Sequence, residues 1–328
     1  MKIPNVIVFS DYITSVCSYW RSQNPFSELA REGKINLIIG DYNKEDWTTL
    51  RICDIAFFQR PVMNNVKNQI LMAKDMKVKG IWIDLDDSNN IPIHHPIYGI
   101  YKSGYDELSF KKIMIVADIV TTTTQYLKNI YLKYTNNIQI IPNALNDYWL
   151  DFSPSKRGKN IFLRAGDHHE HDIYEYKDCI IDVMNNHKDW KLIVCGSNPI
   201  FLQQEIENYI YSGDYNIHDY FAYILQSNCS IFILPLLKNE LNFGKSNIGW
   251  LEATLSGASS LTPNYWKLHN YSLTYKDKKT FKENLEKLIT DENLRKELWT
   301  KSVQKVKKDY LLSKVNNKRM DIIKNLMK

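Results

Sequence analysis

Residues 230–256 read SIFILPLLKNELNFGKSNIGWLEATLS, and this stretch decides the fold. It opens with a short apolar run, Ser230–Leu234, which Pro235 ends. A polar connection follows, and Ser246–Ser256 then repeats apolar residues at helical spacing. A buried strand followed by a helix is the unit from which parallel sheets are built. The stretch therefore predicts an α/β fold with a parallel sheet.

The same alternation runs through both halves of the chain. Candidate strands of the first half are Val6–Phe9, Ile35–Ile39, Ile55–Phe58, Gly80–Ile83, Ile119–Thr121 and Ile138–Ile141. Those of the second half are Ile161–Leu163, Trp190–Val194, Ser230–Leu234 and the weaker Ser259–Leu261. Candidate helices are Met63–Met76, Gln125–Tyr134, Ile173–Asn185, Phe201–Tyr211, Tyr220–Gln226 and Ser246–Ser256, and the chain reads as helix from Lys278 onward.

The alternation breaks around Asn146–Lys159, where polar residues, Pro and Gly cluster without apolar period. We therefore predict two Rossmann-like, doubly wound domains that face a cleft, residues 1–148 and 149–300. Residues 301–328 form a basic helical segment that could pack back on the first domain. This segment holds nine Lys and Arg against two Asp. It is either a solvated helix face or a contact for nucleic acid or lipid head groups.

The composition is that of a globular protein. The 328 residues are 44% hydrophobic and 24% charged, and no apolar run is long enough to span a bilayer. The start of the chain lacks the features of a signal peptide. The five cysteines are scattered and never spaced as C-x-x-C, which favours reduced thiols. A cytoplasmic protein is expected, in the host cytoplasm if the gene is carried by a phage.

Lys245 and Glu252 are the sharpest candidate ligands. If Ser246–Ser256 and the residue before it are helical, seven residues place them two turns apart on one face. Gly244 permits a tight entry, and the free N–H groups around Ser246 would form an anion site. A cation there and a carboxylate deeper in would suit a nucleotide diphosphate and its ribose. An ordinary amphipathic surface helix would give the same spacing.

The K-S-x-I-x-W-L-E form of this segment resembles the donor-binding helix of retaining, two-Rossmann-domain (GT-B fold) glycosyltransferases, the family 4-like group, and particularly those of phage and bacterial surface-glycan genes. The resemblance implies that Lys245 binds the donor diphosphate and Glu252 the ribose. Many members carry a first Glu eight residues before the second, and Gly244 stands there in this chain.

Leu163–Asp172 resembles an R-G-x-x-x-H-x-x-D element of the same group, with Ala165 where Gly is more usual. Arg164 at a strand end could contact the diphosphate, and Gly166 allows close backbone approach. His169 could pair with Asp172 three residues on. Two alternatives stay open, which are a solvated His-rich turn and a metal site made by His168, His169, His171 and Asp172.

Two further turns suit a donor site. Gly196 ends the segment that begins with the strand Trp190–Val194, and Cys195 lies between the strand and this glycine. Backbone groups near Ile217 or His218 are candidate contacts for the donor base, as the resemblance implies for a loop before such a helix. Helix capping by Asn216 and Asp219 would also explain this turn.

The first half carries carboxylates and histidines that could serve an acceptor. Asp84, Asp86 and Asp87 follow the strand Gly80–Ile83, and His94 and His95 lie in an extended loop. A divalent-metal site at the aspartates, turn capping, and packed or exposed loop histidines are the alternatives. Because a two-domain fold can replace the metal with Lys, Arg and a helix dipole, we expect acceptor binding and no metal.

Together these features predict a glycosyltransferase. It would move a hexose or pentose from a UDP- or GDP-linked donor to an acceptor hydroxyl, with retention and without a further cofactor. Arg164, Lys245, Glu252 and His169 are the predicted catalytic residues. The acceptor is a glycan, a lipid-linked glycan or hydroxymethylated phage DNA. A sugar-nucleotide epimerase or hydrolase of the same fold and a non-catalytic nucleotide-sugar-binding protein are the alternatives, and the oligomeric state is left open.

Overall fold

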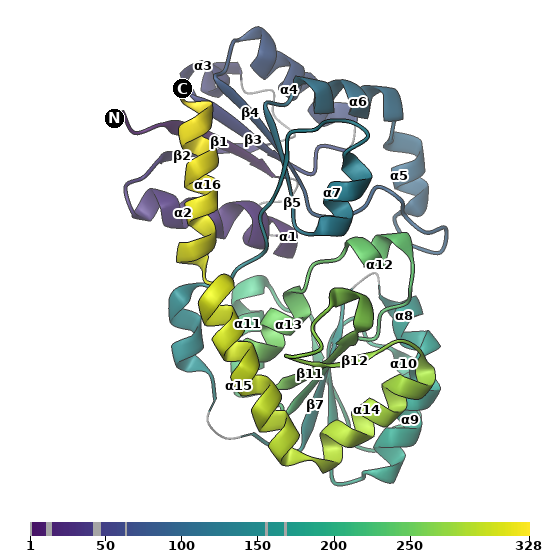
Figure 1. Ribbon diagram of the computed structural model, residues 1–328. Helices are drawn as coiled ribbons and strands as arrows, with labels where there is room; N and C mark the ends of the chain where they lie inside the picture. The colour runs from purple at the N-terminus through teal and green to yellow at the C-terminus, as the bar shows by residue number, and fades with distance from the viewer. Residues whose placement is uncertain (1, 11–14, 42–46, 63, 155–156, 167–168) are drawn as a thin grey trace. The chain divides into compact units, whose positions relative to one another are not determined.

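The computed structural model describes residues 2–10, 15–41, 47–62, 64–154, 157–166 and 169–328. They form two compact units (Figure 1). The first unit is the chain up to residue 144 together with residues 243–246 and 312–328, and the second unit is residues 145–242 and 247–311. Each unit contains one parallel sheet of six strands. The predicted α/β fold with two Rossmann-like domains is confirmed.

The sheet of the first unit has the strand order β2-β1-β3-β4-β5-β6. Its strands are β1 (Asn5–Ser10), β2 (Asn36–Asp41), β3 (Ile55–Gln59), β4 (Gly80–Leu85), β5 (Ile119–Thr122) and β6 (Ile138–Ile140). The helices are α1 (Val16–Ser18), the π-helical η1 (Tyr19–Gln23), α2 (Asn24–Arg31), α3 (Trp47–Ile52), α4 (Asn64–Asp75), α5 (Tyr98–Gly104), α6 (Glu107–Val116), α7 (Gln125–Tyr131) and α16 (Leu312–Leu326).

Both faces of this sheet are covered by apolar side chains. Successive residues of a strand point to opposite faces, so Ile81 and Ile83 of β4 join one buried cluster and Trp82 joins the other. Helix α16 contributes Val315 and Ile322 to the cluster that contains Trp82. A sheet buried on both sides explains why β1, β3 and β4 read as continuous apolar runs.

The sheet of the second unit has the order β12-β11-β10-β7-β8-β9. Its strands are β7 (Asn160–Ala165), β8 (Lys191–Gly196), β9 (Tyr209–Gly213), β10 (Ile231–Ile233), β11 (Ser259–Pro263) and β12 (Leu273–Tyr275). The helices are the 3-10 turn η2 (Asp147–Phe152), α8 (Glu170–Glu175), α9 (Lys177–Asn186), α10 (Ile200–Gln203), α11 (Ile217–Gln226), α12 (Glu240–Gly244, whose last two residues belong to the first unit), α13 (Ile248–Leu255), the 3-10 turn η3 (Asn264–Trp266), α14 (Lys278–Thr290) and α15 (Glu292–Asp309).

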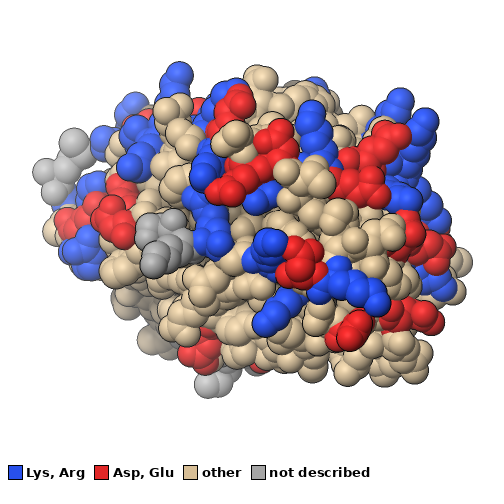
Figure 2. All heavy atoms as spheres, turned by 90° about the horizontal axis from the view of Figure 1, so that it is seen from below, with Lys and Arg blue, Asp and Glu red and all other residues tan. Residues whose placement is uncertain are grey.

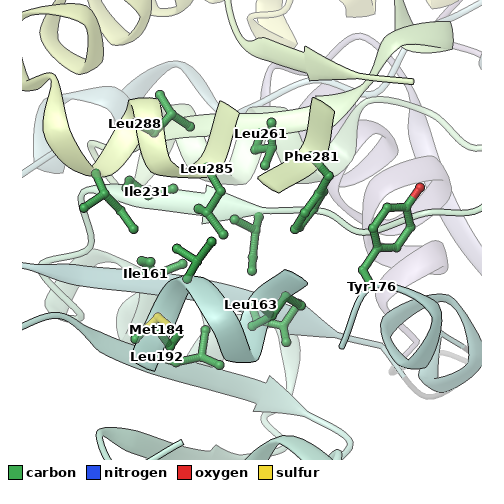
Figure 3. Close-up of a cluster of buried hydrophobic side chains, with 14 of the residues drawn as sticks. Ile161, Leu163, Tyr176, Met184, Leu192, Ile231, Leu261, Phe281, Leu285 and Leu288 are labelled. Atoms are coloured by element: carbon green, nitrogen blue, oxygen red, sulfur yellow. The ribbon is translucent and has the colours of Figure 1, made fainter. Parts of the chain in front are cut away.

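The core of the second unit lies where α9 and α14 cover one face of the sheet (Figure 3). Phe281, Leu285 and Leu288 of α14 pack against strand residues such as Ile231 and Leu261. This core holds the strands rigidly. It thereby fixes the position of the loops that follow their carboxyl ends, where α/β sheets bind ligands.

Three of the predicted helices differ from the structure, and one of them, Ile173–Asn185, is divided at Tyr176 into α8 and α9. Phe201–Tyr211 holds only the short α10, and its end belongs to β9. Because β9 is an edge strand with exposed residues, it lacks the apolar run of a buried strand. The predicted helix Ser246–Ser256 is α13, and it begins at Ile248.

Candidate functional site

Glu252 and Arg164 meet at the carboxyl edge of the second sheet. Arg164 is the fifth residue of β7, and its Nε lies 3.3 Å from Oε2 of Glu252 on α13. The hydroxyl of Tyr220, on α11, donates to the same oxygen at 3.0 Å. Glu252 is fully buried, whereas the Arg164 side chain is 30% exposed. The carboxylate is therefore enclosed by the protein, whereas the guanidinium is partly accessible to solvent.

The second oxygen of Glu252 is unsatisfied. Oε1 is buried and has no hydrogen-bond partner among the residues that the structure describes. Burial raises the pKa of the Glu252 carboxyl, and Arg164 and the Tyr220 hydroxyl oppose that rise only in part. A buried carboxylate oxygen without a donor is unfavourable unless a ligand supplies one. The arrangement can therefore accept a hydrogen bond from a ligand hydroxyl.

Two glycines let the surrounding backbone come close. A Cβ on Gly196 would lie 2.0 Å from the carbonyl oxygen of Ala165, and the residue has a φ of +104°. The loop after β8 can therefore lie directly on the end of β7, where the Ser197 N–H donates to that carbonyl at 2.7 Å. A Cβ on Gly249 would lie 2.6 Å from the Leu234 side chain, so this glycine lets the first turn of α13 approach the end of β10.

The loop after β7 contains the predicted histidine. Nδ1 of His169 lies 2.8 Å from Oδ2 of Asp172, which confirms the predicted pairing. Gly166 lies beside this histidine, and a Cβ there would contact its ring at 3.3 Å. His168 lies outside the described residues. Among the residues that are described, no group of three or more His, Cys, Asp or Glu side chains is placed to hold a metal ion.

The start of α11 is a capped helix terminus. Oδ1 of Asn216 accepts from the N–H groups of His218 and Asp219, each at 3.1 Å, so the capping alternative is confirmed. Ile217 is buried. The His218 N–H is engaged by the cap, so a base contact at this turn would need other backbone groups. The contact of Ile217 and His218 with a donor base stays a prediction.

Lys245 does not lie on the helix of Glu252, and the predicted two-turn spacing is wrong. Helix α12 ends at Gly244 and α13 begins at Ile248 after its N-cap, Asn247. Gly, Ser and Asn are weak helix formers, so the intervening segment leaves the helical path. Lys245 and Ser246 fall in this break. The Ser246 hydroxyl accepts from Nδ2 of Asn143 at 2.9 Å in the first unit.

Lys245 instead belongs to a charge network of the first unit. Its Nζ lies 3.0 Å from Oδ1 of Asp87. Arg60, directly after β3, binds both oxygens of Asp86 at 2.8 Å and reaches Oδ2 of Asp87 at 2.9 Å. Two cations thus face two carboxylates at the carboxyl ends of β3 and β4. The side chains of Arg60 and Lys245 are each 27% exposed, so ligands can approach the network.

Arg60 has a backbone conformation that side chains rarely adopt, with a φ of 49°. Such strain persists only where the surroundings hold it, and it is common at functional sites. Arg60 was not among the predicted site residues. A single Arg at the carboxyl end of the apolar run Ile55–Phe58 was the signal available in the sequence.

Asp84 has a different position from its two neighbours. It is 1% exposed, and the Arg21 guanidinium donates to both of its oxygens, at 2.6 and 2.9 Å. The Thr121 hydroxyl donates to Oδ1 at 2.5 Å. The Asp84 carboxylate therefore holds η1 onto the sheet. It is not exposed to an acceptor in this arrangement.

The predicted histidines of the first unit lie in the loop before α5. His94 is exposed, whereas His95 is buried and its Nδ1 accepts from the Ile97 N–H at 3.3 Å. The packed-loop alternative therefore describes His95. Gly244 packs closely in the same unit, since a Cβ there would lie 2.9 Å from the Leu127 side chain. Acceptor contacts by His94 and His95 stay predictions.

No protein-family model and no curated protein matches this sequence. Solved structures do share its fold. A glycosyltransferase from Rickettsia africae has a TM-score of 0.65 at 13% identity, with both chains covered completely. A UDP-forming trehalose-phosphate synthase from Burkholderia xenovorans has a TM-score of 0.69 at 9% identity, again over the whole of both chains. The chain therefore has the fold of GT-B glycosyltransferases.

Larger proteins share the fold over part of their length. The Staphylococcus aureus protein TarM, solved with UDP and α-GlcNAc-glycerol, has a TM-score of 0.59 at 13% identity. The match covers 83% of this chain and 55% of TarM, so the chain spans just over half the length of that relative.

Proposed function

We propose that this protein is a glycosyltransferase that transfers a sugar from a nucleoside-diphosphate sugar to an acceptor hydroxyl, with retention of the anomeric configuration. The observation that carries the proposal is the unsatisfied Oε1 of Glu252 beside Arg164. A ribose offers adjacent hydroxyls to a carboxylate, and a diphosphate offers negative charge to a guanidinium. One nucleotide can therefore satisfy both groups.

The residues then support departure of the diphosphate. Breaking the sugar–phosphate bond leaves new negative charge on the phosphate oxygens, and Arg164 would stabilise that charge as it forms. The free N–H groups at the start of α13 favour an anion in the same way. Lys245, which precedes the cap of α13 by two residues, is a proposed second cation for the diphosphate. His169 is a proposed donor to a phosphate oxygen.

The acceptor is proposed to bind in the first unit, near Asp86 and Asp87. Their carboxylates would accept hydrogen bonds from the hydroxyls of a sugar or polyol. The acceptor hydroxyl would attack from the face that the leaving group occupied, and its proton would pass to a phosphate oxygen. That path needs no protein nucleophile.

A panel of nucleotides and nucleotide sugars tests the proposal. Ligand present at 100 times its dissociation constant stabilises a protein by about 2.7 kcal/mol, which raises its unfolding temperature measurably. UDP or GDP should do so, and CMP or NAD should not. A labelled sugar should then appear on a polyol or glycan acceptor, and NMR of the product gives the anomeric configuration. If no nucleotide stabilises the protein, the proposal fails.

A hydrolase or epimerase is the second candidate. The fold is shared with a candidate UDP-N-acetylglucosamine 2-epimerase from Listeria monocytogenes, with a TM-score of 0.63 at 10% identity. Release of free sugar or an altered sugar nucleotide, without any glycosylated acceptor, would favour this class. Binding without turnover would favour a nucleotide-sugar-binding protein.

The basic segment at residues 301–328 bears on a DNA acceptor. The structure divides it between the end of α15 in the second unit and α16 in the first. Arg319 is 2% exposed, and Lys305 pairs with Asp309 at 2.7 Å. On the face shown in Figure 2, basic and acidic side chains are interspersed. The burial of Arg319 and the pairing of Lys305 reduce the positive charge that this segment offers to phosphates, which favours a glycan or lipid-linked glycan as acceptor.

Salt dependence separates the two acceptors. Phosphate contacts make DNA affinity fall steeply with salt. We expect weak duplex binding with a shallow slope, unchanged when Lys305, Lys307 and Lys308 are neutralised together. A steep slope that this triple substitution abolishes would establish DNA as the partner.

Within the described residues, no helix is both long and apolar enough to cross a membrane.

A further inference from the structure

A buried amide joins two loops at the carboxyl edge of the second sheet. Asn242 is 1% exposed, and its Nδ2 donates to both oxygens of Asp172, at 3.0 and 3.1 Å. The same nitrogen lies 3.1 Å from the carbonyl oxygen of Leu237, whose own N–H donates to Oδ1 of Asp172 at 3.1 Å. Asp172 on α8 therefore holds both ends of the segment 237–242, a turn after β10 that leads into α12.

The turn is also closed on itself and fixed at its start. The Asn242 N–H donates to Oδ1 of Asn239 at 2.8 Å. At the other end, the Leu236 N–H donates to the hydroxyl of Tyr275, on β12, at 2.6 Å. Loops of this kind are usually exposed and mobile. Here hydrogen bonds at the start and the end of the turn hold its course within the protein.

Asp172 also orients His169. Its Oδ2 lies 2.8 Å from Nδ1 of the imidazole. An ionised carboxylate only accepts hydrogen bonds, so Nδ1 carries the hydrogen and Nε2 is presented on the far edge of the ring. The His169 side chain is 25% exposed and is therefore partly accessible to a ligand. One carboxylate thus determines both the tautomer of His169 and the position of the turn.

We infer that Asn242 and Asp172 are positioning residues for donor binding, a role that rests on the proposed function. Asn242 acts through Asp172, because its amide fixes the rotation of the carboxylate that holds His169. His169, Asp172 and the turn after β10 are thereby held in one geometry. A site ordered in advance binds its ligand without losing further conformational freedom, which favours affinity. Neither residue needs to touch the sugar nucleotide.

A double-mutant cycle with UDP as the probe tests the inference. Asn242→Ala should weaken UDP binding about tenfold, the effect of one hydrogen bond to a charged group. If Asn242 acts through His169, the same substitution in a His169→Ala background should add little further loss. Asp172→Asn, which keeps the size of the side chain, should behave like His169→Ala. Asn284→Ala is the matched control, since Asn284 also bonds a backbone carbonyl in this unit, at 2.9 Å from Thr274.

Nitrogen-15 NMR of labelled histidine gives a readout independent of nucleotide. His169, identified by its loss in His169→Ala, should show the Nδ1–H tautomer in the natural protein and a mixture in Asn242→Ala. An unchanged His169 spectrum, or equal losses of UDP affinity in both backgrounds, would overturn the inference. If the natural protein binds neither UDP nor any other nucleotide, the proposed function fails, and the NMR result still decides whether Asn242 orients the histidine.

Discussion

Replacement of Glu252 by Gln should change ligand binding and stability in opposite directions. Hydrogen bonds to a charged acceptor contribute about 1.5–3 kcal/mol, and those to a neutral acceptor about 0.5–1.5. For one or two ribose hydroxyls the loss is about 1–3 kcal/mol. This corresponds to UDP binding that is weaker by about 5- to 150-fold.

At pH 7 the ligand-free stability of the same variant should equal or exceed that of the natural protein. The pKa of Glu252 is raised in the folded state, with burial as the largest cause. Its contribution to stability is therefore fully present below the unfolded pKa and is lost as the pH rises through the folded pKa. Above its folded pKa the natural protein buries a charge that the neutral amide of the variant does not carry. The advantage of the variant should shrink as the pH falls toward the ordinary range for glutamate.

Two measurements check this prediction. Calorimetric titration with UDP gives the affinity, and thermal unfolding between about pH 4 and pH 8 gives the stability. Thr254→Val is the matched control, because Thr254 is equally buried on α13 and its hydroxyl donates to the Trp250 carbonyl at 2.8 Å. A Glu252→Gln variant that binds UDP as tightly as the natural protein would refute the ribose role. One that unfolds more easily at pH 7 would refute the reasoning about its charge.

Three other substitutions follow from the same contacts. Lys245→Ala should weaken UDP binding without unfolding the protein, since the partly exposed Lys245 side chain pairs with Asp87. Full turnover by the variant would show that Lys245 is not part of the donor site. Asp87→Asn should release Lys245 and tighten UDP binding by up to about fivefold, the scale of an exposed ion pair, whereas Asp86→Asn, whose partner is Arg60, should not. Tyr220→Phe removes a hydrogen bond that lowers the pKa of Glu252. The ionised carboxylate, and with it UDP binding, should therefore develop at a higher pH than in the natural protein, which UDP titrations across the pH range would show.

The strands at the centre of each sheet could be predicted from the sequence. Strands such as β4 and β7 are covered on both faces, so their central residues, Ile81–Ile83 and Ile161–Leu163, are continuously apolar. The edge strands β9 and β12 are short or partly exposed, and their residues carry no such signal. β9 was predicted as the end of a helix for this reason.

The site was predicted in part. Arg164 and Glu252 come together as the two segments suggested. Arg164 lies at the end of the predicted strand Ile161–Leu163, and Glu252 lies on the helix predicted after the strand Ser230–Leu234. Tyr220 could not be found, because an aromatic residue on the apolar face of α11 is indistinguishable from core until its hydroxyl is placed. The helical link between Lys245 and Glu252 was wrong because periodicity continues across Ser246 and Asn247, although the helix does not.

Two buried carboxylates show why burial alone does not identify a binding residue. Asp84 and Glu252 are both almost completely buried beside an arginine at the end of a sheet. Asp84 receives two bonds from Arg21 and one from Thr121, so its charge is balanced within the protein. Within the part of the chain that the structure describes, Glu252 has one oxygen satisfied and one without a donor. A ligand hydroxyl would complete that oxygen, and we therefore propose a binding role for Glu252 and a scaffolding role for Asp84.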